Sequence, residues 1–220
     1  MKLPVHDENS LNRNPAEVRA MAVAVQANLV QLVVAESKRR GRRPIDHDIK
    51  VFSPGHVKHF RETLIDPKTI AAYSDLELHL RLREIWGRFC LMRCLFSLTE
   101  SDKPVSFAGL PDDMEMHCET ALQIKCAEVR AFLWKMLFEQ RRRTDPDYVR
   151  SPLFSEDASV AERIPAAGFG KPIEKLTDEE LLYTSCEHAG MLAAIHWVLD
   201  KRLAWNAPDI MQADRPEVAP

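Results

Sequence analysis

Helix start signals recur along this chain, and they constrain its fold more than any other feature. The segment 14–17 (Asn-Pro-Ala-Glu) combines an N-cap residue, a proline at the first helical position and a carboxylate three residues after the cap. Ser74 with Glu77, and Thr177 with Glu180, form capping boxes. Apolar residues follow each signal at spacings of three and four, and nothing alternates with a period of two for long enough to indicate a strand. The sequence therefore predicts an all-α fold.

We expect a single-domain bundle of about five to six helices. The first runs from residue 15 to about 40, where Gly41 ends it and the preceding cations suit the negative end of the helix dipole. The other helices are expected at 53–65, 66–73, 74–98, 111–143 and 177–203. Gly190 and Ala194 lie four residues apart on the last of these. Their small size either lets another helix approach closely or is simply tolerated there.

The expected helical bundle domain occupies residues 15–203, between an N-terminal arm at 1–14 and a disordered tail at 204–220. Four prolines and two glycines lie between residues 144 and 176, where periodicity is weak. We expect this segment to be an irregular loop or linker. Because structureless stretches of this length are uncommon inside a compact domain, it would then be either a connector or a functional loop.

The composition is that of a globular protein, with 45% hydrophobic and 29% charged residues. No stretch reaches about 20 uninterrupted apolar residues, and the N-terminus lacks the layout of a secretory signal, so no membrane partner is expected. The five cysteines are an odd number and favour a reducing, cytoplasmic location with free thiols. As small hydrophobes they are expected to fill the core.

The most conspicuous local feature is a basic run at residues 38–43, made of Lys38, Arg39, Arg40, Arg42 and Arg43. Removing these five cations from the net charge of −3 leaves −8 for the rest of the chain. Charge is therefore segregated, and phosphate binding depends on the local field more than on the net value.

About six residues of this run loosely resemble the Arg-Gly-Arg-Pro core of AT-hook segments, which lay arginines in the minor groove of AT-rich DNA. Arg43 interrupts that core here. The resemblance implies contact with nucleic acid. The alternatives are a solvated helix end that complements the helix dipole, and a contact with an acidic protein.

A second basic cluster, Arg141, Arg142 and Arg143, ends the expected 111–143 helix. If this helix packs parallel to the first one, the two clusters lie on the same side and form one patch, whereas antiparallel packing separates them. The sequence does not choose between these arrangements. We take both clusters together as the candidate nucleic-acid-binding residues.

A metal or thiol site is a further alternative. Cys90 and Cys94 lie four residues apart on one expected helix, and Cys118 and His188 lie on two others. Helical bundles build metal sites from side chains on facing helices. No Cys-x-x-Cys pair occurs, however, so no metal and no cofactor is expected.

Catalytic motifs are missing from the sequence. It has no Gly-x-Ser-x-Gly, Walker or dinucleotide glycine pattern, and we assign no catalytic residue. The four tryptophans are expected to anchor helix packing rather than to stack on bases.

We therefore expect a non-enzymatic helical interaction protein that contacts nucleic acid or a nucleoprotein complex through a basic helix end. One alternative is a protein–protein adaptor or regulatory subunit without nucleic-acid contact. Another is a metal- or thiol-dependent helical enzyme or sensor. The long apolar helices are compatible with a homodimer, but no heptad repeat specifies one.

Overall fold

The computed structural model describes residues 12–43, 54–96, 98, 107, 110, 115–164 and 172–205. Within these ranges it contains seven α-helices and no strand, which confirms the all-α fold. The helices are α1 (Pro15–Arg39), α3 (Pro67–Ala72), α4 (Asp75–Leu95), α5 (Glu119–Thr144), α6 (Pro146–Val149), α7 (Pro152–Arg163) and α8 (Asp178–Leu199). Three 3-10 turns accompany them: η1 (Pro54–His56), η2 (Arg61–Thr63) and η4 (Ile173–Lys175).

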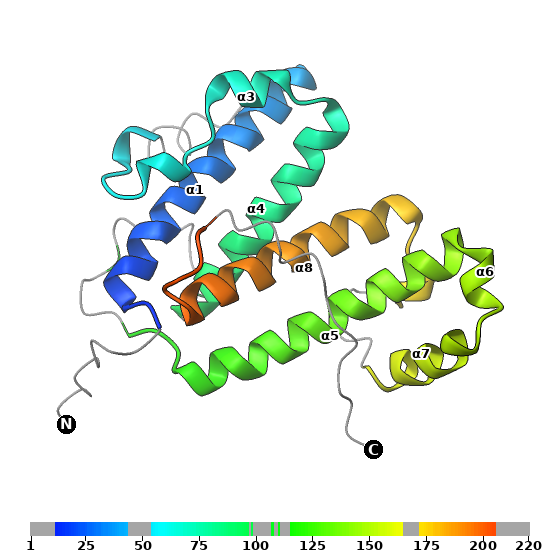
Figure 1. The fold of residues 1–220 in the computed structure, drawn as a ribbon. Coiled ribbons are helices and arrows are strands. Elements are labelled where there is room, and N and C mark those ends of the chain that lie inside the picture. Colours follow the sequence, from blue (N-terminus) through cyan, green and yellow to red (C-terminus); the bar gives the residue numbers. More distant parts are fainter. Residues whose placement is uncertain are drawn as a thin grey trace.

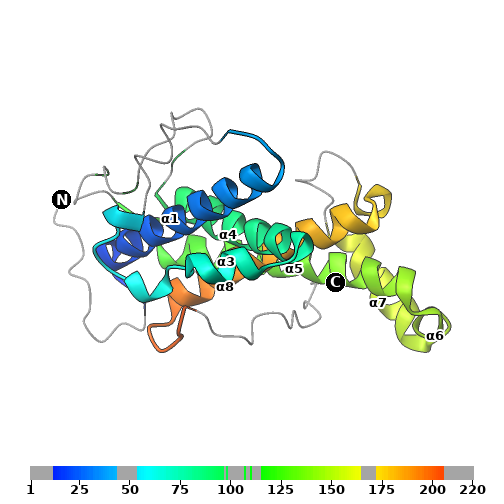
Figure 2. The same cartoon turned by 90° about the horizontal axis from the view of Figure 1, so that it is seen from above.

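The C-terminal helix α8 lies at the centre of the bundle. It packs against both α4 and α5, and α4 in turn packs against α1 (Figure 1). Helices α1 and α5 begin near each other and diverge, with α4 and α8 between them, while α6 and α7 lie at the far end of the molecule from α1 in both views (Figure 2). The core between these helices is apolar, and its largest fully buried side chains include Met21, Leu32, Leu78, Phe96, Phe107 and Leu192.

The predicted helix starts at α1, α4 and α8 are confirmed. The Asn14 side chain accepts a hydrogen bond from the amide of Glu17 (2.8 Å), which satisfies one of the free amides at the start of α1. Both capping boxes form, at Ser74 and at Thr177. Gly41 ends α1 in the left-handed region with φ +65°, a conformation that glycine adopts without steric cost.

The close approach suggested by Gly190 is also confirmed, and its partner is Gly87 on α4. A Cβ atom on Gly87 would lie well inside 3.0 Å of the Glu187 carbonyl, and one on Gly190 would meet the Glu84 carbonyl in the same way. The two backbones are therefore in direct contact where α4 and α8 cross.

The expectation of an irregular loop at 144–176 is wrong for most of its length. Pro146 and Pro152 each take the first turn of a helix, α6 and α7, where a missing N–H costs nothing. Asp145 caps α6 by accepting from the amide of Tyr148 (2.9 Å). These two prolines are the first residues of helices and do not make the segment irregular. Residues 165–171 lie outside the described residues.

Two other expected helices differ from the structure. The segment expected as one helix at 53–65 contains only η1 and η2, because Phe60 between them adopts a left-handed backbone with φ 55°. The expected 111–143 helix begins at Glu119, and the residues described just before it are not helical. There the amide of His117 donates to the Leu95 carbonyl (2.9 Å), which ties this segment to the end of α4.

At each end of the expected 15–203 bundle, a residue assigned to a flanking segment contacts the bundle. Arg13, assigned to the N-terminal arm, donates to the carbonyls of Trp197 (2.8 Å) and Leu203 (2.9 Å). Trp205, assigned to the disordered tail, is buried and packs edge-on against Trp197, with ring centroids 5.3 Å apart. The last helix ends at Leu199 and not near 203. Residues 1–11 and 206–220 lie outside the described residues.

By length and composition, α1 is the one described helix that qualifies as a possible membrane span. In its most apolar window 56% of the residues are buried within the bundle. The core helix of a globular protein passes the same test, so the observation is weak evidence for a span.

Candidate nucleic-acid interface

Some side chains of the basic run form ion pairs with other described residues, and others do not. Arg39 reaches the start of α4, where it pairs with Asp75 (Nη1 to Oδ1, 2.9 Å) and donates to the Tyr73 carbonyl (2.7 Å). Its guanidinium therefore joins α1 to the segment between α3 and α4. This candidate residue has a structural role.

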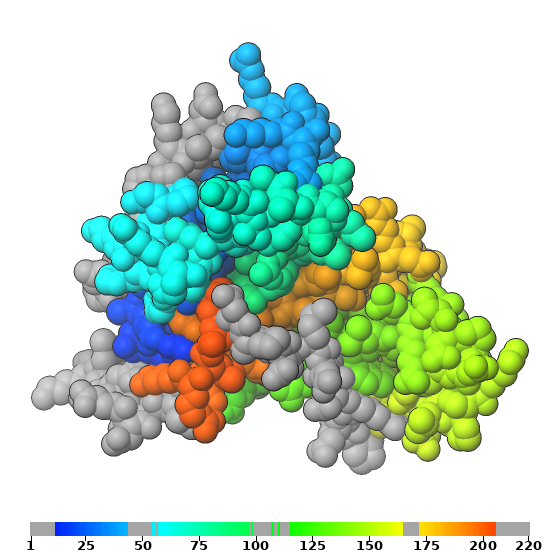
Figure 3. All heavy atoms as spheres, turned by 45° about the horizontal axis from the view of Figure 1, so that its top comes forward, coloured from blue at the N-terminus to red at the C-terminus, as the bar shows by residue number. Residues whose placement is uncertain are grey.

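Lys38, Arg42 and Arg43 are exposed, and the described residues supply no ion pair to any of them. The left-handed turn at Gly41 carries the last two beyond the helix end, with the Arg42 amide donating back to the Ser37 carbonyl (2.8 Å). Figure 3 shows the end of α1, in lighter blue, at the upper edge of the molecule beside α4. Three positive charges that have no ion pair among the described residues therefore lie at one end of the bundle.

A groove runs from this basic end along the junction of α1 and α4. Its volume is about 310 Å³. We call it the α1–α4 groove, and its lining residues are Leu29, Val33, Glu36, Arg40, His79, Leu82, Arg83 and Trp86. Apolar side chains occupy one part of it and charged side chains the other, so it offers both an apolar surface and cations to a ligand.

The charged part of the groove is organised around Glu36. Its carboxylate lies 2.8 Å from Arg40 Nη2 and 2.8 Å from His79 Nε2. The His79 ring stacks on Tyr183 of α8 at a centroid distance of 5.5 Å. The single carboxylate lining the groove thus has two partners already, and its charge is balanced.

Arg83 is less engaged than Arg40. Its ion pair with Glu187 is long (3.8 Å), and its guanidinium lies 5.8 Å from the centre of the Tyr183 ring. Burial raises the pKa of Glu187, while the charge of Arg83 opposes that rise. Arg83 therefore keeps much of its positive charge available to the groove.

The second basic cluster is neutralised within the fold. Glu139, itself buried, accepts from Arg142 (2.7 Å) and from Arg143 (2.7 Å). Arg143 also pairs with Asp178 at the start of α8 (2.8 Å), and Arg141 pairs with Asp145 (3.4 Å). Three acidic groups face three arginines, so the cluster joins α5 to its neighbours.

The two clusters do not form one patch on the described surface. Helices α1 and α5 run in broadly the same direction but diverge, and α4 and α8 separate their C-terminal ends (Figures 1 and 2). Neither of the two arrangements considered from the sequence, direct parallel packing or direct antiparallel packing, describes this geometry.

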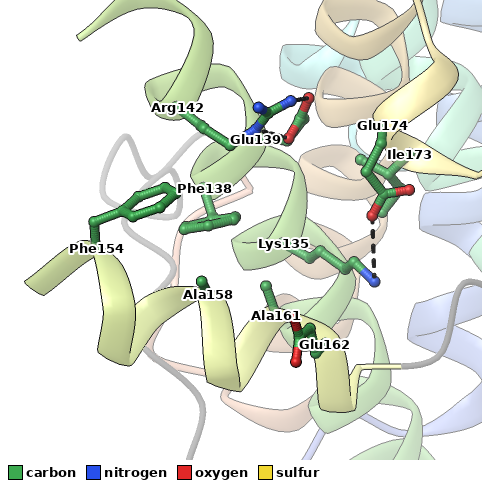
Figure 4. Close-up of a pocket in the computed structure, with 10 residues that line it drawn as sticks. All are labelled: Lys135, Phe138, Glu139, Arg142, Phe154, Ala158, Ala161, Glu162, Ile173 and Glu174. Atoms are coloured by element: carbon green, nitrogen blue, oxygen red, sulfur yellow. Dashed lines mark hydrogen bonds and ion pairs between the residues drawn. The ribbon is translucent and has the colours of Figure 1, made fainter. Parts of the chain in front are cut away.

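A smaller pocket of about 170 Å³ lies between α5 and α7, closed by η4 (Figure 4). Lys135 is buried beside it, where its ammonium donates to the Ile164 carbonyl (2.9 Å) and lies 3.9 Å from Glu174. Phe138 and Phe154 stack on its other side with centroids 5.8 Å apart. The cations and the buried carboxylate beside this pocket already have partners within the protein, so we favour the α1–α4 groove.

The four candidate metal ligands are not brought together. Within the described residues no group of three or more His, Cys, Asp or Glu side chains is arranged to hold a metal ion. Cys94 and Cys118 are exposed, Cys118 being the N-cap residue of α5. His188 packs against Phe132 and contacts the Thr184 carbonyl through Nδ1 (2.9 Å). Burial lowers the pKa of His188.

Two other thiols are shielded. Burial raises the pKa of Cys126, against the opposing charge of Arg130, and it also raises the pKa of Cys186. A raised pKa decreases the thiolate fraction, and the thiolate is the reactive form. These two cysteines therefore behave as small apolar residues, as expected, whereas the expectation that all five fill the core is wrong for the exposed Cys94 and Cys118.

Sequence reasoning missed the contribution of α4 to the groove. The tryptophans expected to anchor packing do so at Trp134, Trp197 and Trp205, which are buried, but Trp86 is 39% exposed. His79, Arg83 and Trp86 follow one another at spacings of four and three, which places them along one helical stripe. This spacing is the sequence feature from which the α4 side of the groove could have been predicted. It lies beside the longer apolar stripe of the same helix.

Comparison of the chain with protein family models, with curated proteins and with solved structures found no match.

Proposed function

We propose that this protein is a non-enzymatic interaction protein that binds nucleic acid, alone or in a nucleoprotein complex, through the basic end of α1. The observation that carries the proposal is the set of three exposed cations, Lys38, Arg42 and Arg43, to which the described residues supply no ion pair. Arg83 extends the positive charge into the adjoining groove, whereas Arg40 is already paired with Glu36 there. Phosphate neutralisation by such a cluster supplies affinity without requiring catalytic groups.

Binding is tested by fluorescence anisotropy with labelled DNA and RNA across a range of salt concentrations. Three phosphate contacts predict a slope of about −2 to −3 in a plot of log affinity against log salt. Simultaneous substitution K38A/R42A/R43A should abolish most of this binding and flatten the slope. Because all three side chains are exposed, the variant should retain its circular dichroism spectrum and its melting temperature.

The matched control removes the same charge elsewhere. K58A/R150A/K175A takes away three exposed cations from other parts of the surface. If both triple variants weaken binding equally, the effect comes from net charge and the assignment to α1 is wrong. If the wild-type protein binds no nucleic acid at low salt, the proposed function is wrong. Binding of an acidic protein by the basic end of α1 is then the alternative to test.

A further inference from the structure

The α1–α4 groove carries an apolar surface that phosphate binding alone does not use. Of the described large hydrophobic side chains that remain exposed, Val33 of α1 and Trp86 of α4 line this one groove from opposite sides, at 42% and 39% exposure. Leu29 and Leu82 line the same groove. An exposed indole held on a rigid helix is a stacking platform, because every nucleobase presents a flat π-face to it.

The surroundings of this platform favour an anionic ligand with a flat apolar part. Arg40 and Arg83 stand at the groove with side chains 45% and 43% exposed. The one lining carboxylate, Glu36, already has Arg40 and His79 as partners. The exposed cations at positions 38, 42 and 43 lie at the same end of α1 as the groove-lining Arg40.

The dimensions suit one unpaired base. A volume of about 310 Å³ lies at the lower end of the range for small-molecule sites. Trp86 follows His79 by seven positions on α4, which is a rise of about 10 Å along the helix axis. A strand with a base on the indole therefore has its neighbouring phosphates within reach of the basic end. Paired bases in a duplex are stacked on each other and do not present a free face.

We propose that the α1–α4 groove binds an unpaired base of single-stranded nucleic acid, stacked on Trp86, while Arg83 and the basic end of α1 bind the adjoining phosphates. This inference rests on the proposed function and narrows its substrate class to single strands.

Three labelled probes of equal length test it: an oligo(dT), a duplex, and an oligomer of abasic sites that keeps the phosphates and lacks the bases. The wild-type protein should bind the oligo(dT) most tightly. Trp86→Ala should weaken oligo(dT) binding by about 5- to 100-fold. It should leave the affinity for the duplex and the abasic oligomer, and the salt dependence, within twofold of the wild type.

Ile124→Ala is the matched control, because Ile124 is an exposed apolar residue (59%) on α5, away from the groove. It should change none of the three affinities. Photocrosslinking of the wild-type protein to an oligonucleotide that carries 5-iodouracil gives an answer that does not depend on how a variant folds. The crosslink should map to the peptide containing Trp86.

The outcomes separate the two proposals. If all three probes bind equally, W86A changes nothing and K38A/R42A/R43A abolishes binding, the basic end binds phosphates and the base site is overturned. A crosslink that maps outside α1 and α4 overturns the base site as well. If no probe binds the wild-type protein, the proposed function itself fails.

Discussion

Gly87 of α4 and Gly190 of α8 occupy equivalent positions on the two sides of one helix crossing. Each faces a backbone carbonyl that lies three residues before the other glycine, at Glu187 and at Glu84 respectively. The contact is therefore reciprocal, backbone against backbone, and it lies where the central helix of the bundle meets the helix that also forms the groove. Any atom added to either glycine separates the two helices.

Gly87→Ala and Gly190→Ala should each destabilise the protein by about 3 kcal/mol or more, because a backbone carbonyl cannot move aside as a flexible side chain can. In a chain of this size that loss lowers the melting temperature by about 6–12 °C. Differential scanning calorimetry measures it. Gly41→Ala is the comparison: it meets no atom within 4 Å and is strained only by its φ of +65°, so its cost should be smaller. Equal effects in all three variants would contradict the close crossing.

Arg13→Ala should release the C-terminal end of α8. The Arg13 guanidinium donates to the carbonyls of Trp197, Lys201 and Leu203 and lies 4.0 Å from the centre of the Trp197 ring. Loss of these charge-assisted hydrogen bonds should cost about 2–3 kcal/mol in urea unfolding. Arg13→Lys should restore little of it, because an ammonium lacks the planar fork that reaches several acceptors. Full recovery by lysine would indicate that charge alone matters.

Glu139 should make stability depend on pH in the acidic range. Burial raises the pKa of Glu139, but the hydrogen bonds from Arg142 and Arg143 outweigh it and hold the pKa below its ordinary value of 4.5. A carboxyl whose pKa is lowered on folding stabilises the native state above its unfolded pKa, and this contribution is lost as the pH falls through the folded pKa.

Glu139→Gln should therefore lower the free energy of unfolding by about 1.5–3 kcal/mol at pH 7 and flatten its decline below pH 4.5. Urea titrations at a series of pH values measure both effects. Asp147→Asn removes a carboxylate that is 96% exposed and makes only a long ion pair, so it should change stability little. A variant curve parallel to that of the wild type below pH 4.5 would exclude Glu139 as the source.

His188 should act in a separate pH range. Burial lowers the pKa of His188, a hydrogen bond with the Thr184 carbonyl raises it, and the charge of Lys125 lowers it further. Its folded pKa consequently lies below the ordinary 6.5, so the unfolded state takes up the proton first as the pH falls. Stability from this group is complete above pH 6.5 and decreases below it.

His188→Gln should remove part of the stability loss that the wild-type protein suffers between pH 7 and pH 5. Urea midpoints at half-unit pH steps compare the two proteins directly. Burial and the charge of Arg130 also lower the pKa of His196, so His196→Gln should act in the same direction. If neither substitution alters the dependence of the urea midpoint on pH between pH 7 and pH 5, folding does not lower the pKa of His188 or of His196.

The groove shows how much of a site can be predicted from a sequence. The basic run at 38–43 is recognised from the sequence alone, because its five cations lie within six consecutive residues. The contribution of Trp86 was not, because its spacing on α4 also suits a core position, and only packing decides which side of a helix stays exposed. The same limit applies to Arg141–Arg143, which look like a second binding patch until Glu139 and Asp178 are found beside them.

The misassigned segments have a common cause as well. Pro146 and Pro152 suggest interruptions when the sequence is considered alone, although proline is also favoured in the first turn of a helix. The helix expected at 111–143 was placed to begin too early, since the described residues just before Glu119 are attached to the end of α4 through His117 and Leu95. A local start signal is compatible with a helix, but a contact with a distant segment can move the first helical residue further along the chain.

The sequence by itself determined the fold class and most helix beginnings, because caps and apolar periodicity act over three or four residues and are written in neighbouring positions. Only the tertiary structure decided which charges remain available. Arg39 meets Asp75 and Arg143 meets Asp178 across more than 30 residues of chain. The charge of a surface is what remains after such pairs have formed. Only the packed helices therefore show which cations at the end of α1 have no ion pair within the part of the chain that the structure describes.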